Sequence, residues 1–356
     1  MSKQSVAVGL SGGVDSSVAA LLLKQAGYEV TGLFMRNWKE ESPDGVCTAE
    51  EDYSYVRAVA QKLDIPYYTI DFSKEYAEKV FSHFVSEYEK GRTPNPDVLC
   101  NSEIKFGPFL NFAKGIGADY IATGHYAGIE RRDGTAYLLR AADENKDQTY
   151  FLNQLNQEQL SPVLFPLAHL QKSEVRKIAA ENGLSSAFRK DSTGICFIGE
   201  RDFRAFLAQY LPMKKGEIRD LNDRVLGYHD GVFFYTIGQR KGFGLGGVKG
   251  AKNDAPFYVI KKDVRRNILY VNQGECPELY SDSLDTENFN YISGEFPDGA
   301  RVLVRTRHRE PLRSATAYKT DVGVHVEFDA PERAVTPGQY AVLYSDRVCL
   351  GGGIIK

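Results

Sequence analysis

The sequence predicts an α/β domain built on a parallel sheet, followed by two small mainly-β domains, the last of them a β-barrel. In the first third of the chain, short apolar runs alternate with stretches of helical periodicity. Beyond Pro212 the pattern changes to short alternating runs separated by Gly, Asp and Asn, which is typical of small barrels and sandwiches. The length of 356 residues is about twice what one core usually organises. We therefore expect domains at 1–205, 206–275 and 276–356.

The first domain is expected to hold a parallel sheet covered by helices. Its apolar runs lack polar alternation, as strands do when both faces of the sheet are buried. Functional residues in such sheets gather at the carboxyl ends of the strands. The expected strands are Val6–Leu10, Glu29–Met35, Ile65–Asp71 and Asp119–Gly124, with helices from Val18 toward Gly27, near 50–63 and over 172–183.

The rest of the chain is expected to consist mainly of short strands after a helical segment at 202–211. Gly, Asp and Asn punctuate the alternating runs there at close intervals, as they do in antiparallel sheets. The expected strands are Gly231–Ile237, Pro256–Lys261, Asn267–Val271, Val302–Arg309, Val322–Phe328 and Ala341–Tyr344.

Composition and charge exclude several classes of protein. With 42% hydrophobic and 26% charged residues, the chain is neither disordered nor collagen-like. Its net charge of −3 neither requires nor excludes a nucleic acid. No apolar run approaches the roughly 18 residues of a membrane-spanning helix, and the first residues are too short of apolar side chains for a signal peptide. We expect a cytoplasmic protein with no membrane partner.

The five cysteines, at positions 47, 100, 196, 276 and 349, are too far apart to form a CxxC pair. The sequence therefore contains neither a local zinc knuckle nor a thioredoxin-type pair. Cys47, Cys276 and Cys349 are expected to be structural, whereas the other two stand in unusual surroundings.

A glycine turn joins the first expected strand to the first expected helix. Over Ser11–Ser17 the letters SGGVDSS place glycines where a backbone can approach a phosphate, at a helix N-terminus that favours anions. Asp15 could cap this helix or help to hold a magnesium ion. A tight turn with a Ser/Asp cap is the alternative. The pattern is neither the Rossmann fingerprint nor a Walker A loop.

The letters SGGVDS resemble the signature of the ATP pyrophosphatase, or PP-loop, superfamily. That resemblance implies an adenine nucleotide alpha hydrolase-like fold, cleavage of ATP between its α and β phosphates, transfer of AMP to a substrate oxygen, and Mg²⁺ as the accompanying ion. Met35 and Gly124 end two strands where an adenine pocket needs apolar or small walls. The ATP-binding residues implied are Gly9, Leu10, Ser11, Gly12, Gly13, Val14, Asp15, Ser16, Met35 and Gly124.

The segment GRTPNPDVLCN contains the first unusual cysteine. Pro96 suits the start of a helix, so Asp97 and Cys100 are expected three residues apart on one face of its first turn. There the helix N-terminus favours a thiolate, and Asp97 offers a proton donor or acceptor. A buried helical cysteine with an Asp cap is the alternative. In DSTGICFIGE the turn residues Ser, Thr and Gly precede Cys196, which predicts a thiol on a mobile loop; a structural cysteine is equally compatible.

Several blocks, in order, resemble the tRNA-specific 2-thiouridylases. They are GRTPNPDVLCN, IKF, ATGHYA, KDQTYFL, DSTGICFIGER, TIGQRKGFGLGG, TPGQYAV and CLGGGII, and the likeness runs from about Val6 to Ile355. It implies a tRNA-uridine 2-sulfurtransferase that adenylates the C2 oxygen of uridine 34 and replaces it with sulfur. It also implies tRNA as the partner, with Glu, Gln and Lys isoacceptors expected, and an upstream persulfide carrier or cysteine desulfurase.

The same resemblance assigns roles to single residues. Cys196 would carry the persulfide, Cys100 would be the nucleophile that leaves a transient disulfide with Cys196, and Asp97 would be the general acid/base. Whether sulfur passes directly from the persulfide or as hydrosulfide stays open. The residues implied in contact with the target base are Asn95, Pro96 and Asp97, and those implied in contact with tRNA are Lys146, Asp147 and Gln148.

Two basic strips offer further places for RNA. Residues 240–266 hold eight Lys or Arg against two acids, and residues 301–319 hold six against one. In a regular strand Arg305, Arg307 and Arg309 would point to one face, suited to a phosphate backbone, with His308 on the other face. A solvated strand face is the alternative. His125 could be a satisfied strand-end histidine or a residue of the nucleotide site.

Two other functions fit parts of the sequence. A PP-loop amidating or ligating synthetase, which acts on a small adenylated carbonyl, would need neither Cys100 nor Cys196. A non-catalytic nucleotide-dependent tRNA-binding protein would bind tRNA without forming AMP.

Overall fold

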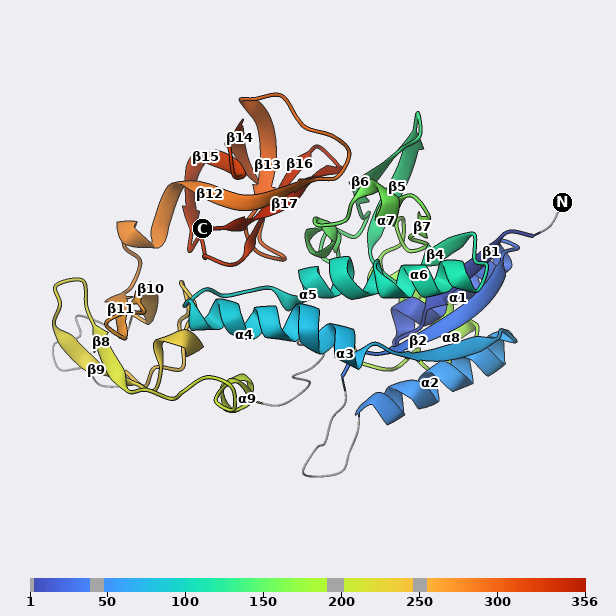
Figure 1. Cartoon of the computed structure of the whole chain (residues 1–356), viewed down its shortest axis with the longest axis horizontal. Helices are drawn as coiled ribbons and strands as arrows, with labels where there is room; N and C mark the ends of the chain where they lie inside the picture. The colour runs from blue at the N-terminus through green and yellow to red at the C-terminus, as the bar shows by residue number, and fades with distance from the viewer. Residues whose placement is uncertain (1–2, 39–47, 191–201, 246–254) are drawn as a thin grey trace.

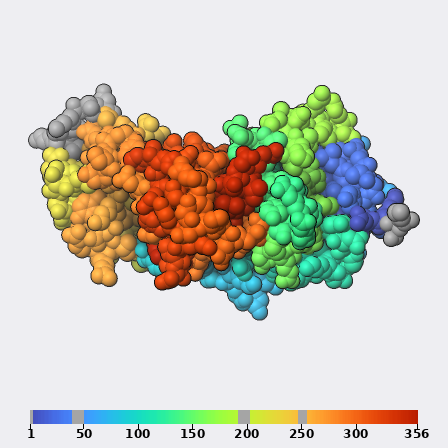
Figure 2. All heavy atoms as spheres, turned by 90° about the horizontal axis from the view of Figure 1, so that it is seen from above, coloured from blue at the N-terminus to red at the C-terminus, as the bar shows by residue number. Residues whose placement is uncertain are grey.

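The computed structural model describes residues 3–38, 48–190, 202–245 and 255–356. It combines an α/β layer structure with two groups of strands (Figure 1). Seen from above, the last group, which is coloured orange to red, lies in the middle of the molecule (Figure 2). The predicted fold class, an α/β domain followed by mainly-β domains, is confirmed. No helix in the described ranges is long and apolar enough to cross a bilayer.

A parallel sheet forms the centre of the first domain, in the order β3-β2-β1-β4-β7. All four of its neighbouring pairs are parallel, as predicted from the doubly apolar strands. The two faces of the sheet differ, because successive side chains of a strand alternate. The strands are β1 (Ser5–Gly9), β2 (Glu29–Arg36), β3 (Tyr67–Asp71), β4 (Tyr120–Ala122) and β7 (Val163–Leu164).

Helices cover both faces of this sheet. Val6 and Val8 of β1 pack with α1 (Val14–Gln25), α2 (Thr48–Leu63) and α8 (Lys172–Glu181). Ala7, between them, packs with the helices of the opposite face. These are α3 (Ser73–Tyr76), the π-helix η1 (Ala77–Phe81), α4 (Ser82–Glu89), α5 (Pro96–Leu99), the π-helix η2 (Cys100–Lys105) and α6 (Pro108–Gly115). Shorter elements are the 3₁₀ turn η3 (Thr149–Leu152) and α7 (Gln157–Leu160).

The central group of strands lies at the far end of the molecule from α1 and α2 (Figure 1). Its order is β10-β11-β8-β9, with β11 and β8 parallel and the other pairs antiparallel. The strand predicted at Gly231–Ile237 is wrong: a 3₁₀ turn, η4 (Val232–Phe234), replaces it, because the Gly231 N–H bonds to Nδ1 of His229 and turns the chain. The elements are α9 (Phe203–Leu207), β8 (Gly216–Arg219), β9 (Val225–His229), β10 (Phe257–Asp263) and β11 (Ile268–Gln273).

Within residues 280–355 six strands close into a barrel, because β12 pairs with both β15 and β17. A hairpin of the first domain, β5 (Ala127–Arg132) and β6 (Thr135–Arg140), continues this sheet, since β6 pairs with β17. The first domain and the barrel are therefore joined through one sheet and through a common core. After the 3₁₀ turn η5 (Pro277–Leu279), the barrel strands are β12 (Tyr280–Tyr291), β13 (Ala300–Arg305), β14 (Arg313–Lys319), β15 (Val324–Arg333), β16 (Tyr340–Ser345) and β17 (Val348–Ile355).

Candidate active site

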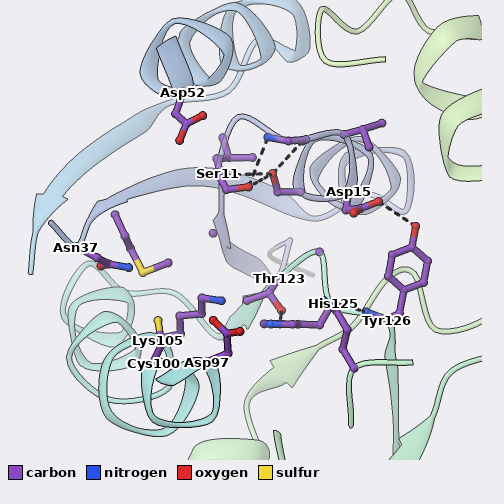
Figure 3. A pocket seen from close by; sticks show the side chains of 18 of the residues that line it. Ser11, Asp15, Asn37, Asp52, Asp97, Cys100, Lys105, Thr123, His125 and Tyr126 are labelled. Carbon is purple, nitrogen blue, oxygen red and sulfur yellow. Dashed lines mark hydrogen bonds between the residues drawn. The ribbon is translucent and has the colours of Figure 1, made fainter. Parts of the chain in front are cut away.

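A cavity of about 660 Å³ opens at the carboxyl ends of β1, β2 and β4. This is the edge at which parallel sheets place their functional residues. The glycine turn forms one wall and the helix with Cys100 the opposite wall (Figure 3). Five cationic side chains line it against three carboxylates, so the cavity suits an anionic ligand. The cations are Arg36, Lys105, Lys146, Lys190 and Arg309, and the carboxylates are Asp15, Asp52 and Asp97.

The glycine turn is held in shape by its own hydroxyl groups. The hydroxyls of Ser16 and Ser17 both donate to the carbonyl oxygen of Gly13, at 3.1 and 2.8 Å. The Ser11 N–H donates to Oγ of Ser16 at 3.2 Å. The backbone N–H groups at the start of α1 therefore face the cavity in a fixed arrangement, as a phosphate requires. Of the ten residues implied to bind ATP, all but Gly12 line the cavity.

Gly12 is the one implied ATP-binding residue that does not line the cavity, and its position in the turn accepts only glycine. Its φ of +77° is left-handed, and a Cβ there would lie 2.6 Å from the carbonyl oxygen of Asp52. The Arg189 guanidinium, which is ion-paired with Asp52, would lie 2.9 Å from the same Cβ. The first glycine of the motif thus permits a segment that is distant in sequence to pack on the turn.

The carboxylate of Asp15 is held from two sides. Lys172, at the start of α8, contacts both its oxygens at 2.7 Å, and the Tyr126 hydroxyl donates to one of them at 2.9 Å. Asp15 does not cap α1, since the helix has no side-chain cap. Among the described residues no three His, Cys, Asp or Glu side chains group together as a metal site. A magnesium ion here would depend on the phosphates it accompanies and on Asp15.

The opposite wall is built by α5 and η2. The helix begins at Pro96, as predicted, and both Asp97 and Cys100 line the cavity from its first turn. Cys100 is buried, with 6% of its surface exposed. Asn95 and Pro96 do not line the cavity, and Oδ1 of Asn95 is buried with no hydrogen-bond partner among the described residues. Beyond Leu99 the chain does not continue as a regular α-helix, because it widens into a π-helix and a new helix starts at Pro108.

Asp97 is a candidate acid because of its surroundings. Burial raises the pKa of its carboxyl, and the positive charge of Lys105 offsets part of that rise. A raised pKa keeps a proton on the carboxyl to higher pH, which suits a group that must donate or accept one near neutrality.

Replacing Asp97 by asparagine should stabilise the folded protein at neutral pH. Since the pKa is raised on folding, ionisation of Asp97 costs stability once the pH exceeds its unfolded value of about 4. Urea unfolding should therefore give equal stabilities near pH 4 and a growing advantage for Asp97→Asn up to pH 8. A variant that is less stable than the wild type at pH 8 would contradict the raised pKa.

His125 is a buried histidine with a hydrogen-bond partner, and it also faces the cavity. It is buried between the rings of Phe106 and Phe165, and its Nδ1 shares a hydrogen bond of 2.7 Å with the Thr123 hydroxyl. It also lines the cavity. Burial and the charge of Lys105 hold its pKa well below the ordinary value, so the imidazole is neutral at physiological pH.

The barrel supplies the remaining wall, and here one prediction is wrong. Arg305, Arg307 and Arg309 do not share a strand face, because β13 ends at Arg305 and residues 306–309 form a turn with Arg309 at φ +67°. Arg309 and His308 line the same cavity instead of pointing apart. Arg307 donates to the hydroxyl of Thr336 at 2.6 Å.

Arg305, the last residue of β13, pairs with a buried carboxylate. Arg305 and Asp147 form an ion pair of 3.0 Å, with side chains 6% and 0% exposed. Asp147 also accepts from the Thr149 hydroxyl. Neither member of the pair lines the cavity, whereas Lys146 and Gln148, on either side of Asp147, do. The pair thus holds the segment of Lys146 and Gln148 against the turn that carries His308 and Arg309.

Two predicted cysteines cannot be placed against this geometry. Cys196 and Cys47 lie outside the described residues. The described segment that precedes Cys196 in the chain ends at Lys190, which lines the cavity. Cys349 is buried in β17 and Cys276 is partly exposed before η5, and neither lines the cavity.

Comparison with known proteins assigns the chain to a family. Residues 4–200 match a family model described as tRNA methyl transferase HUP domain. Residues 204–273 and 281–355 match models described as tRNA methyl transferase PRC-barrel domain and Aminomethyltransferase beta-barrel domain. The chain is 57% identical over 353 residues to tRNA-specific 2-thiouridylase MnmA 2 of Geobacillus kaustophilus (strain HTA426), covering 98% of this chain and 94% of that protein. The chain belongs to the family of the tRNA-specific 2-thiouridylases.

Other members of this 2-thiouridylase family are nearly as similar. The MnmA of Streptococcus thermophilus (strain ATCC BAA-491 / LMD-9) is 54% identical over 358 residues, which cover 99% of this chain and 95% of the relative. That of Alkaliphilus oremlandii (strain OhILAs) is 53% identical over 353 residues, covering 98% and 96%. The resemblance found in the sequence blocks is confirmed.

In this member of the 2-thiouridylase family, several residues that line the cavity were not predicted from the sequence. Lys105 stands in the block IKF, which supported the resemblance but suggested no role. Asn37 and Trp38 follow β2 directly and line the cavity, and Oδ1 of Asn37 is buried without a hydrogen-bond partner in the part of the chain that the structure describes. Their position at the carboxyl end of a parallel strand was the available signal.

Proposed function

We propose that this protein is an ATP-dependent tRNA-uridine 2-sulfurtransferase that converts uridine 34 to 2-thiouridine, with release of AMP and pyrophosphate. One observation supports this most directly. A single cavity joins a phosphate-binding turn to a buried thiol and an acid on the opposite wall (Figure 3). A nucleotide and a nucleophile can therefore meet at one substrate atom.

ATP is the first substrate, and the turn fits its phosphates. The turn offers N–H groups at the start of α1, and Gly12, Gly13 and Gly124 keep side chains away from its backbone. Met35 and Phe34, at the end of β2, provide apolar surface in the same cavity for the adenine. Mg²⁺ would enter with ATP, and Asp15 is the residue proposed to face it.

Transfer of AMP to the C2 oxygen of uridine makes a poor leaving group into a good one. Asp97, whose pKa is raised, would exchange a proton with the base, and Asn95 and Pro96 would hold the backbone of the helix start against it. The base would have to leave its stack to reach this depth. A persulfide on Cys196 would attack C2, and Cys100 would then attack the Cys196 sulfur, so that a Cys100–Cys196 disulfide forms and an external reductant restores both thiols.

The tRNA would lie along the wall formed by the segment of Lys146 and Gln148 together with the barrel turn of His308 and Arg309. Lys146, Gln148 and Arg309 line the cavity there and are the proposed contacts, while Asp147 and Arg305 support them from behind. We propose the Glu, Gln and Lys isoacceptors as substrates and a persulfide carrier or cysteine desulfurase as the sulfur donor.

Reconstitution tests this proposal against its rivals. Purified protein with ATP, Mg²⁺, a persulfide donor and unmodified tRNA should produce 2-thiouridine at position 34, measured by nucleoside mass spectrometry, with one AMP per modified base. AMP formation without thiolation, or turnover of a small amide substrate by a Cys100→Ser, Cys196→Ser double variant, would favour the amidating synthetase instead. Binding of tRNA without any AMP would indicate a non-catalytic protein.

A further inference from the structure

A π-helical turn places a lysine beside the proposed nucleophile. In η2, Cys100–Lys105, the Phe106 N–H bonds to the carbonyl oxygen of Asn101, five residues back. In an α-helix, residues five positions apart point about 140° away from each other. A π-helix has more than four residues per turn, so a residue five positions further on lies much closer to the face of the first than it would in an α-helix. Lys105 therefore shares a face with Cys100, and both line the cavity with Asp97.

The Lys105 ammonium has no protein partner in the described part of the chain. No hydrogen bond or ion pair joins it to another described residue. Of the five Lys and Arg side chains that line the cavity, it is the one carried by the helical turn of Cys100. Figure 3 shows its side chain rising from that helix into the space below the glycine turn. Its field reaches both Asp97 and His125, because it lowers the pKa of each. A cation so placed, without a hydrogen bond or ion pair to a described residue, is suited to bind an anionic ligand in the cavity.

We propose that Lys105 is a catalytic residue of the sulfur-transfer step, where its ammonium binds the α-phosphate of the adenylated uridine and neutralises the AMP that leaves. This inference rests on the proposed function. Under this proposal, the α-phosphate contacts Lys105 on the wall opposite the glycine turn.

The charge balance of that step explains the need for a cation. The adenylated uridine is a phosphodiester with one negative charge on its phosphate. When sulfur forms its bond to C2, the C2–O bond breaks and its electron pair stays on the oxygen of AMP. The phosphate becomes a monoester with two negative charges, and the sulfur loses one. An ammonium group fixed at this position stabilises charge that appears only as the bond breaks.

Nucleotide binding tests the proposal without requiring thiolation. The variants are Lys105→Met, which removes the charge, Lys105→Arg, which keeps it, and Lys114→Met on the exposed surface of α6 as a matched control. Calorimetry should show AMP binding weakened about tenfold or more by Lys105→Met. The affinity for adenosine, which lacks the phosphate, should stay within about twofold of wild type in every variant. An unchanged adenosine affinity also shows that the nucleotide site is intact. Lys105→Arg should restore most of the affinity for AMP.

Single-turnover kinetics with tRNA supply the second measurement. Release of pyrophosphate, which precedes the step, should change little in Lys105→Met, while formation of 2-thiouridine slows by about 10²-fold. Equal loss of AMP and adenosine affinity, or unchanged AMP affinity, would overturn the role of Lys105. If wild-type protein forms no 2-thiouridine, the proposed function fails instead, and the AMP-to-adenosine ratio still decides whether Lys105 binds the phosphate.

Discussion

Replacing Cys100 by serine should abolish formation of 2-thiouridine while the affinity for ATP stays within about twofold of wild type. The serine hydroxyl is close in size to the thiol, so the wall of the cavity keeps its shape. It cannot attack a sulfur atom to form a disulfide, and we expect at least a 10³-fold loss of thiolation in nucleoside mass spectrometry. Pyrophosphate release should persist, because adenylation does not use the thiol.

Cys276→Ser is the matched control for this experiment. Cys276 is partly exposed just before η5 and does not line the cavity, so thiolation should be unchanged. A Cys100→Ser protein that retains a tenth of wild-type thiolation would show that another group carries out the attack. The role of Cys100 would then be structural, as its burial alone would allow.

Replacing Gly124 by alanine should weaken ATP binding at least tenfold. A Cβ at Gly124 would lie 2.6 Å from the backbone nitrogen of Ser16 and 2.7 Å from the carbonyl carbon of Asp15. Backbone atoms cannot rotate aside as side chains do, so the first turn of α1 must move and the phosphate-binding N–H groups move with it. Isothermal titration with ATP measures the loss.

Gly115→Ala provides the comparison. A Cβ at Gly115, in the last turn of α6, meets no atom within 4 Å, and its φ is not left-handed. This variant should bind ATP like the wild type and unfold at slightly higher urea concentration, since alanine favours a helix over glycine. An unchanged ATP affinity in Gly124→Ala would contradict this account. It would show that Gly124 only lines the cavity, as its sequence position suggested, and that the turn does not depend on the absence of a side chain there.

Local sequence patterns predicted much of the fold and indicated one wall of the candidate site. The doubly apolar runs indicated the parallel sheet, and the glycine turn indicated the phosphate-binding wall, because both depend on neighbouring residues. Pro96 marked the helix start that aligns Asp97 with Cys100. The individual domain limits at 205 and 275 stay predictions, and the proposed roles of the site residues stay proposals.

What the sequence did not reveal depends on distant partners or on unusual backbone geometry. Lys105 was missed because regular helical spacing points it away from Cys100, and no sequence pattern announced the π-helix. The arginines of 305–309 were assigned to one strand face by simple alternation. Asp147, 158 residues earlier, pairs with the first of them, and the strand ends there. The pairing of β6 with β17 is equally long-range.

The pairing of β6 with β17 limits how such a chain can be divided into independent parts. Leu138 of the hairpin and Cys349 of the barrel are both fully buried and lie opposite each other. A fragment that ended at the expected first boundary would leave β6 as an open edge with apolar residues ready to join another molecule. Recombination could not exchange the barrel alone for an unrelated RNA-binding module without also replacing the hairpin. The two parts are therefore expected to have been inherited together, as one evolutionary unit.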